Sequence, residues 1–551
     1  MSRFNTRPHR PAGSSPVTTT GRTTTHAGGT GYSRDERSEL VLLAAMNMVG
    51  QRTHYERADA RDERYRNLIR HLAIEDPGWT AGMLGWLRTG AHMRTDSQIG
   101  AVEFVHARLA AARLHRVLPG PDAVPGTGET WNRSVVRRVL HRADEPGELL
   151  AYWTSRYGRA LPQPVKRGVG DAVRRLYTER SMIKWDSPRR PYRFGLVLEL
   201  THARATPGES WQSDVFAAAV ARRHGRRPDT RGLTTLRRYE ELMNLPVSER
   251  RRVVLDQPQR IRDSGFTWET LAGWLQGPMD AAAWEAIIPS MGYMALIRNL
   301  RNFDEAGISN AAAAAVATRI ADPRQVAVSR QFPVRFHAAH RAAAPSLRWG
   351  WALEQALEHS TANIPLLPGR TLILVDTSSS MEDSFSADGT TTRRDVAALF
   401  GIALAQRCEA VDLYSYSSGR FGWSGPPRAR TRAFSLRPGE ATLRAVERWE
   451  TGGWFLGGGT DTAAAMRHEY RGHDRVVLIT DEQHHQDPIE VSKSIPAHTP
   501  LYTWNLAGYS PSHAPSGPHR HTFGGLTDQA FRLIPLLEAG HTVPWPWEEQ
   551  Q

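Results

Sequence analysis

The sequence is poor in cysteine, in lysine and in long apolar runs. Cys408 is the single cysteine among 551 residues, so no disulfide can form within the chain and no thiolate cluster can hold zinc. No apolar run approaches the roughly 20 residues that a membrane-spanning helix needs. The first residues also lack the basic-then-apolar order of a secretory signal. These absences argue against a disulfide-stapled or membrane-spanning protein and favour a cytoplasmic one.

The charge is unbalanced toward the basic side. The chain carries 70 Lys and Arg against 57 Asp and Glu, a formal net charge of +13 with an isoelectric point near 10.2. Such an excess favours a polyanionic partner, because neutralising phosphates releases counterions and drives binding. Only Lys166, Lys184 and Lys493 are lysines. A genome that prefers arginine codons explains that preference equally well, but it does not explain the net excess, which favours nucleic acid.

Three regions of different composition divide the chain. Residues 1–33 are rich in Thr, Gly, Pro and Ser and contain four arginines but no acid, a composition typical of a disordered basic tail. Residues 34–365 carry apolar residues near the 3.6-residue helical period, interrupted by Pro, Gly and Asp. Residues 366–551 alternate short apolar runs with helical segments. We therefore expect a tail, an all-α region and an α/β region.

The all-α region contains successive amphipathic segments without a strict repeat motif. Among them are SELVLLAAMNMVG, DPGWTAGMLGWLRTG, GELLAYWTSRYG, VGDAVRRLYTER and SNAAAAAVATRIAD. Alternating β patterning is scarce between them. Such a succession predicts paired helices that stack as an irregular, HEAT-like α-solenoid.

The α/β region contains four strand-like runs, and its pattern predicts a doubly wound sheet. The runs are TLILVD (371–376), AVDLYSYS (410–417), RVVLITD (475–481) and LYTWNLAG (501–508). Strands that alternate with helices form a parallel sheet with helices on both faces. Ligands of such sheets bind at the carboxyl ends of the strands, near the switch in strand order. The run TLILVD brings Asp376 to such an end.

Three polar motifs at strand ends or glycine turns predict a Mg²⁺ site. Asp376, Ser378 and Ser380 alternate after the first strand of the α/β region, and a tight turn can aim one carboxylate and two hydroxyls at one point. The glycine loop GGGTDT (457–462) adds Thr460, and Asp481 ends another predicted strand. Hard oxygen ligands in small number suit Mg²⁺, which keeps several waters. The alternative is a folded turn that holds no metal.

Other chemistries at these residues fit the sequence less well. Ser378 and Ser380 lack a nucleophile-elbow context and a base to complete a triad, so we expect no enzyme. A transition-metal site is a further alternative in the loop after Asp481, but a polar loop fits that stretch better. The side chains concerned are Glu482, His484, His485 and Asp487.

The three motifs resemble the metal-ion-dependent adhesion site (MIDAS) of von Willebrand factor A domains. The resemblance covers residues 366–551, with Asp376, Ser378 and Ser380 at the first motif, Thr460 at the second and Asp481 at the third. It implies a bound divalent cation, most simply Mg²⁺, with one coordination position left open for an acidic group of a partner.

The helical region resembles the TROVE module of the Ro 60 kDa autoantigen family and its bacterial orthologues. The matching stretches are WEAIIPSMGYMALIRNLRNF (284–303), QFPVRFHAAHRA (331–342) and the block 155–207. A TROVE-like module followed by an A domain is the architecture of that family. The resemblance implies a ring of helices closed by the A domain, an outer surface for Y-like small RNA, and a central hole for single-stranded ends of misfolded or partly degraded RNA. It also implies a scaffold that such an RNA can tether to an exoribonuclease.

Two function classes stay open at the level of sequence. The first is an RNA-binding scaffold in RNA quality control or degradation, and the second is a metal-dependent protein-interaction module without an RNA role. For the first, the resemblance points to Lys184, Arg189, Arg190 and His202 on the outer face. Arg298 and Arg301 are further RNA candidates, although capping of neighbouring helices explains them as well. For Phe336, His337 and His340 we expect packing.

Overall fold

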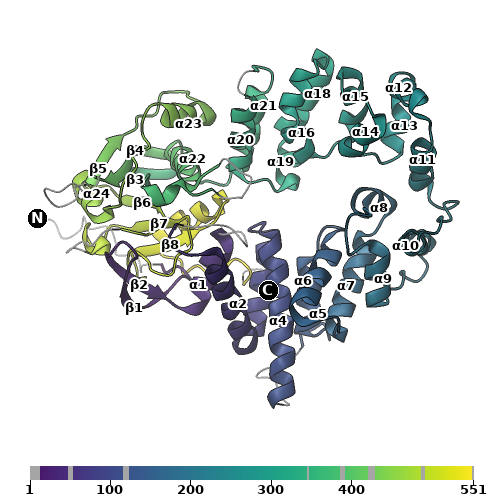
Figure 1. The fold of residues 1–551 in the computed structure, drawn as a ribbon. Helices are drawn as coiled ribbons and strands as arrows, with labels where there is room; N and C mark the ends of the chain where they lie inside the picture. Colours follow the sequence, from purple (N-terminus) through teal and green to yellow (C-terminus); the bar gives the residue numbers. More distant parts are fainter. Residues whose placement is uncertain are drawn as a thin grey trace, which may run out of the picture.

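The helices follow one another around a ring that a β-sheet closes (Figure 1). The computed structural model of the chain describes residues 13–46, 54–115, 123–343, 346–384, 391–419, 429–484 and 490–548. We call α1 to α21, residues 36–360, the helical array, and β3 to α25, residues 367–538, the sheet half. The predicted fold class, a helical-repeat ring followed by an A-type α/β unit, is confirmed.

The first part of the helical array forms the lower and right-hand side of the ring in Figure 1. Local signals start its helices: α3, for example, has Pro77 at its first position, and the Asp76 carboxylate accepts a hydrogen bond from the Trp79 amide at 3.1 Å. Such caps satisfy amides that have no partner within the helix. The helices are α1 (Glu36–Met46), α2 (Ala58–Glu75), α3 (Pro77–Thr89), α4 (Arg94–His115), α5 (Trp131–Val139), α6 (Glu145–Tyr157), α7 (Gln163–Leu176), α8 (Glu179–Trp185), α9 (Phe194–Thr201) and α10 (Ser210–Arg223).

The second part of the array returns along the upper side of the ring to the sheet half. Its helices are shorter, and a buried amide network interrupts one of them: Asn299 separates α16 from α17, and its side chain bonds the Ala295 carbonyl and the Asn302 amide, each at 2.8 Å. The elements are α11 (Thr234–Met243), α12 (Val247–Asp256), α13 (Pro258–Asp263), α14 (Trp268–Leu275), α15 (Ala281–Ile287), η1 (Ile288–Ser290), α16 (Tyr293–Arg298), α17 (Leu300–Glu305), α18 (Asn310–Ala321), α19 (Pro323–Ser329), α20 (Pro333–Ala343) and α21 (Gly350–Ser360).

The sheet half is a six-stranded sheet in the order β5-β4-β3-β6-β7-β8, parallel except for β5. The chain starts at β3 in the middle and builds outward in both directions, so the strand order switches between β3 and β6. The strands are β3 (Leu367–Asp376), β4 (Cys408–Ser418), β5 (Ala429–Ala433), β6 (Arg475–Thr480), β7 (Leu501–Asn505) and β8 (Arg520–Gly524). The helices are η2 (Ser379–Glu382), α22 (Arg393–Ala405), α23 (Thr442–Thr451), α24 (Thr462–Glu469), η3 (Val491–Lys493), η4 (Asp528–Arg532) and α25 (Leu533–Glu538).

Both faces of the sheet are buried, which the continuous apolar run of β3 predicts. Leu372 and Leu374 belong to a small core with α24, whereas Ile373 and Val375 belong to the large core that continues into the helical array. Helix α22 lies close against that second face, because a Cβ on Gly401 would meet Val375 at 2.6 Å. The sheet half and the helical array thus share one hydrophobic core.

The sheet half joins the two ends of the helical array. At the first end α1 contacts β8, and at the last end α20 and α21 contact α22 and α23. The Glu354 carboxylate of α21 caps α23, since it accepts hydrogen bonds from the Thr442 and Leu443 amides at 2.9 and 3.0 Å. His337 of α20 is buried and lies 3.0 Å from Glu450 of α23. Its packing role agrees with the sequence-based expectation.

The prediction of a disordered tail over residues 1–33 is wrong from residue 13 onward. Residues 13–18 run along the sheet half, and β1 (Thr19–Thr24) pairs with β2 (Thr30–Arg34) as an antiparallel hairpin. Threonine favours strands, and contacts with distant residues supply the burial that the local sequence lacks: Val17 and Arg34 are buried. Residues 1–12 lie outside the described ranges.

The chain also crosses between its two halves at the C-terminus. Trp545 and Trp547 are buried after the sheet half has ended, and both rings contact Trp79 of α3 at centroid distances of 5.7 and 5.2 Å. A Cβ on Gly82 would meet Trp547 at 2.6 Å, so a glycine makes this contact possible. Across the described ranges, no helix is both long and apolar enough to cross a membrane.

Candidate metal site and candidate nucleic-acid interface

Two neighbouring parallel strands bring the first and third metal motifs together. Asp376 is the last residue of β3, and Thr480 is the last residue of β6. The Thr480 hydroxyl donates to Asp376 Oδ2 at 2.7 Å, and the Ser378 amide donates to Asp376 Oδ1 at 2.9 Å. Asp481 follows Thr480 directly. The carboxylates therefore meet at the switch in strand order, where this fold binds ligands.

The glycine loop docks the second motif against the first. The Ser379 amide donates to the Gly458 carbonyl at 2.9 Å, and the Gly458 amide donates to the Ser379 hydroxyl at 3.2 Å. Gly458 has φ 91°, and a Cβ there would meet the Ser418 carbonyl at 2.6 Å, so both its conformation and its surroundings require glycine. Two residues later the loop delivers Thr460.

All five predicted metal residues are almost completely buried, and Thr460 follows directly on the glycines that dock against the first motif. The Ser378 and Ser380 hydroxyls lie 3.2 Å apart. One oxygen of Asp481, Oδ1, accepts the Gln483 amide at 3.1 Å, but Oδ2 accepts no hydrogen bond from the described residues. The exposed fractions are 0% for Asp376, 1% for Ser378, 2% for Ser380, 3% for Thr460 and 0% for Asp481.

The negative charges of Asp376 and Asp481 are not fully balanced by nearby positive charge. Burial, and then the charge of Asp481, raise the pKa of Asp376 to about 7, and burial also raises the pKa of Asp481. Two buried carboxylates repel each other unless a proton or a cation lies between them. A divalent cation would supply that charge and would use the free Asp481 oxygen, so the donor set fits the Mg²⁺ that the sequence predicts. No cluster of three or more His, Cys, Asp or Glu in the described ranges is placed to hold a metal; the donors here include hydroxyls.

The segment 54–56 places an aromatic side chain over this site, and sequence reasoning missed it. The Tyr55 hydroxyl is within hydrogen-bonding reach of Ser380, and burial followed by the charge of Asp481 raises the pKa of Tyr55. His54 lies close enough to Asp481 to favour its charged form. Nothing in the local sequence signals this contact, because Tyr55 and Ser380 are 325 positions apart.

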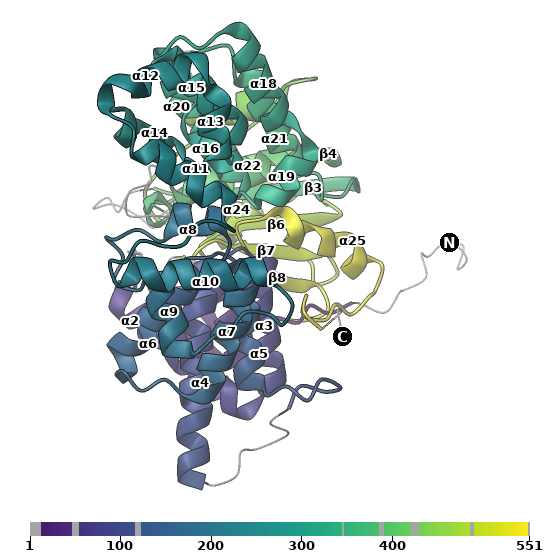
Figure 2. The ribbon, with the colours of Figure 1, turned by 90° about the vertical axis from the view of Figure 1, so that its right-hand side faces the viewer.

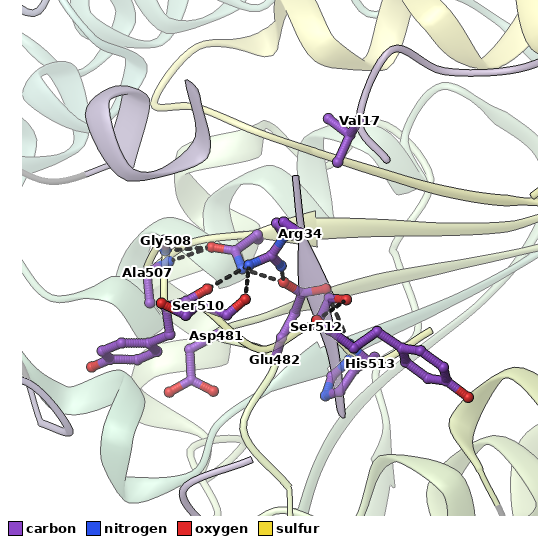
Figure 3. Close-up of polar contacts among 12 residues, drawn as sticks. Val17, Arg34, Asp481, Glu482, Ala507, Gly508, Ser510, Ser512 and His513 are labelled. Carbon is purple, nitrogen blue, oxygen red and sulfur yellow. Dashed lines mark hydrogen bonds and ion pairs between the residues drawn. The ribbon is translucent and has the colours of Figure 1, made fainter. Parts of the chain in front are cut away.

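The loop after Asp481 is tied to the N-terminal hairpin by a buried ion pair. Arg34 of β2 bonds the Glu482 carboxylate and the carbonyls of Tyr509 and Ser510 (Figure 3). Glu482 adopts φ 62°, which is uncommon for a residue with a side chain, and its carboxylate also accepts from Asn505. The polar loop that we favoured over a transition-metal site thus includes a structural ion pair. Of the alternative metal cluster, His485 and Asp487 lie outside the described residues.

The predicted outer-face residues form two groups in the structure. Lys184 and Arg190 lie over the Trp185 ring, at 4.8 and 5.6 Å from its centroid, together with Arg142. Arg190 is also 3.3 Å from Asp144, whose carboxylate is buried, so its charge is largely matched. Lys184 and Arg189 are exposed. His202 is separate from this group along the chain: it ends α9 in the left-handed conformation and is exposed.

Comparison with known proteins gives a family match and a fold match. Residues 257–366 match the TROVE domain. The crystal structure of the Deinococcus radiodurans RO (RSR) protein matches with a TM-score of 0.58 at 14% sequence identity, over 92% of this chain and 100% of that one. Residues 257–366 thus resemble a TROVE domain, and the chain as a whole shares the fold of that Ro protein. No curated protein sequence matches the chain.

The TROVE match includes the helices that carry Arg298 and Arg301. Arg298 is exposed at the end of α16 and lies near Arg335, whose pKa is lowered by burial and by Arg298. Arg301 pairs with Glu305 at 3.3 Å, with both side chains mostly exposed. The Asn299 side chain bonds the Ala295 carbonyl at the end of α16; capping of neighbouring helices by the two arginines stays a prediction.

The excess positive charge of the chain is concentrated in one part of the array. Residues 151–227 contain 16 basic and 6 acidic residues; they form the end of α6 and α7 to α10, which lie opposite the sheet half in Figure 1 and face the viewer in Figure 2. Sequence reasoning did not single out most of these cations, although a running count of charge would have done so. The exposed ones with no ion pair to an acid among the described residues are Arg159, Arg167, Arg175, Arg180, Lys184, Arg189, Arg204, Arg226 and Arg227.

Proposed function

We propose that this protein is a noncatalytic RNA-binding scaffold of the cytoplasm, which binds Y-like small RNA and defective RNAs in quality control or degradation. The observation that carries the proposal is the dense, largely unpaired positive charge of residues 151–227 on a Ro-like fold. Phosphate contacts supply affinity without reading sequence. Such a surface suits a protein that accepts many different RNAs.

The distribution of charge supports the helical array as the RNA-binding region. Residues 34–365 contain 49 basic and 36 acidic residues, whereas residues 366–551 contain 17 basic and 21 acidic residues. A polyanion approaching this molecule is attracted to the array and weakly repelled by the sheet half. The predicted RNA contacts all belong to the array.

Two kinds of RNA site follow from the proposal. Lys184, Arg189 and His202 contact structured RNA on the outer face, with a smaller contribution from Arg190 because Asp144 already matches its charge. A second site takes single-stranded ends at the centre of the ring, and Arg298 with Arg335 is the pair of cations we assign to it. An exoribonuclease tethered through the bound RNA completes the degradation assembly.

A second candidate function rests on the assembled metal motif. A metal-dependent protein-interaction module would bind an acidic partner through the sheet half and would be indifferent to ribonuclease. Nucleic acid that copurifies with the protein, seen as a high ratio of absorbance at 260 to 280 nm and lost after ribonuclease treatment, favours the scaffold.

A substitution series with matched loss of charge tests the outer face. Replacing Lys184, Arg189 and Arg204 with Ala should lower the salt dependence of stem-loop RNA binding by about 2–3 units of slope. The control replaces Arg57, Arg252 and Arg444, which are exposed and lie next to acids, and should change the slope by much less. Equal changes in the two variants would mean that net charge alone drives binding.

A competition experiment tests the two-site arrangement. A Y-like stem-loop and an RNA with a free single-stranded 3′ end should bind together, and the Lys184/Arg189/Arg204 variant should lose the stem-loop preferentially. Mutual displacement at every salt concentration, with equal losses for both RNAs, would contradict separate sites and indicate one diffuse basic surface.

A further inference from the structure

The candidate metal site lies close to residues from the N-terminal part of the chain. In an A domain that docks an acidic partner, one side of the cation must be reachable from solvent. Here none of the five donor residues is more than 3% exposed. Residues 54–55, more than 300 positions away from the first donor, lie close to them, so this neighbourhood belongs to the tertiary fold of the whole chain.

Tyr55 is the residue placed to close the site. Its hydroxyl is within hydrogen-bonding reach of Ser380, and the carboxylates of Asp481 and Asp376 lie close enough to raise its pKa. Its ring packs edge-on against Tyr509 at a centroid distance of 5.4 Å, with the planes at 75°. Tyr509 is itself buried beneath the Arg393 guanidinium, which lies 5.9 Å from its ring. Contacts with the sheet half therefore hold the Tyr55 ring in place.

The hairpin adds a second layer over Tyr55. His26, in the turn between β1 and β2, stacks on the Tyr55 ring at 5.3 Å with the planes within 9° of parallel, and its outer face is exposed. The turn is anchored to the loop that follows Asp481, because the His26 amide donates to Gln483 Oε1 at 2.9 Å and the Thr25 hydroxyl donates to the His484 carbonyl at 2.8 Å. Going inward from solvent, His26 thus comes first, Tyr55 second and the carboxylates last.

The same loop is held at its base by the Arg34–Glu482 ion pair, next to Asp481 (Figure 3). The free Asp481 Oδ2 inside the closed site is the independent sign that a cation is expected there. We propose that a divalent cation bound at this site is sealed by Tyr55 and His26, so that it fastens the N-terminal segment to the sheet half and leaves no position for an acidic group of a partner.

Release of the metal from the full-length chain tests the seal, with Mn²⁺ as a paramagnetic probe in place of Mg²⁺. Tyr55→Ala should speed release of Mn²⁺ into excess chelator by about tenfold or more, because opening of the cover limits escape from a closed site. Tyr55→Phe keeps the ring and removes only the hydroxyl, so its release rate should stay close to that of the wild type. Tyr32, elsewhere on the hairpin, donates its hydroxyl to Glu490 of the sheet half, and Tyr32→Phe should leave the rate unchanged.

Access of small ligands gives the second measurement. In Tyr55→Ala, bulk water and acetate, the simplest acidic group, should both reach the Mn²⁺. Water proton relaxation should therefore rise in this variant and respond to added acetate. In the wild type, neither water nor acetate should reach the Mn²⁺. Wild-type protein that binds acetate at Mn²⁺ or releases the metal as fast as Tyr55→Ala would overturn the proposal, as would wild-type protein that binds no Mn²⁺. RNA affinity should be the same in all variants, so failure of the seal leaves the RNA-binding proposal intact.

Discussion

The helical array and the sheet half differ in how their candidate binding groups are arranged. The array carries many exposed cations spread over several helices. The sheet half assembles five oxygen donors from three distant motifs at one buried point, where each donor needs its neighbours. Distributed charge tolerates substitution and selects by net attraction, whereas a closed site depends on precise local geometry.

The two regions are nevertheless joined more tightly than their compositions suggest. The N-terminal hairpin precedes the array in sequence but packs on the sheet half, and the last tryptophans follow the sheet half but pack on α3. Each end of the chain therefore links one region to the other. Substitutions at these links should affect stability, and substitutions within each region should affect its own ligand.

The largest effect should come from breaking the link at Arg34. Arg34→Met keeps the apolar stem but leaves the Glu482 carboxylate buried and unpaired, which should lower the free energy of unfolding by about 3–5 kcal/mol. Urea unfolding followed by tryptophan fluorescence measures the change. The control is Arg57→Met. Arg57 pairs with Asp59, and their side chains are 85% and 70% exposed, so this variant should lower the free energy of unfolding by less than about 0.5 kcal/mol. Similar costs for both variants would mean that the hairpin is not fastened as we describe.

A smaller effect should separate the metal from the RNA. Asp376→Ala should abolish Mg²⁺ binding and with it the stabilisation that Mg²⁺ confers, which is about 2.7 kcal/mol at a hundred times the dissociation constant. RNA affinity should be nearly unchanged, since the candidate phosphate contacts lie on the array. Asp412→Ala is the control. Asp412 of β4 pairs with Arg370 of β3 and lies opposite Leu372, away from the strand end that carries Asp376. A loss of RNA affinity equal to that of the Lys184/Arg189/Arg204 variant would contradict this separation.

The smallest effect should distinguish two adjacent arginines. Arg189→Gln should lower the salt slope of stem-loop binding by about 0.7–0.9 units, the value for one phosphate contact. Arg190→Gln should lower it by clearly less, because Asp144 and Glu148 already lie 3.3 and 3.6 Å from that guanidinium. Binding titrations at several salt concentrations measure both slopes. The opposite order would show that Arg190 exchanges its acidic partners for phosphate.

The strands and the metal motif could be read from the sequence because their signals are local. The apolar run TLILVD lies within β3, and RVVLITD covers β6 and the residue after it. Asp376 and Asp481 are the last residues of these runs. Parallel strands place such ends on one edge of the sheet, so Asp376 and Asp481 meet as expected. The short edge strands β5 and β8 carry weaker patterns, ARTRA and RHTFG, and were not anticipated.

The sequence by itself thus determined the helical and sheet regions, the strand ends and the donors of the metal motif, because periodicity and turn residues act over a few positions. Only the tertiary structure decided that the polar N-terminal stretch is a hairpin, that Arg190 is paired and that Tyr55 lies beside the candidate metal donors. These features rest on contacts between residues far apart in the chain: Thr25 and His484 are 459 positions apart. A threonine-rich segment has no apolar pattern to announce such contacts, and its order comes from hydrogen bonds and burial that the rest of the fold provides.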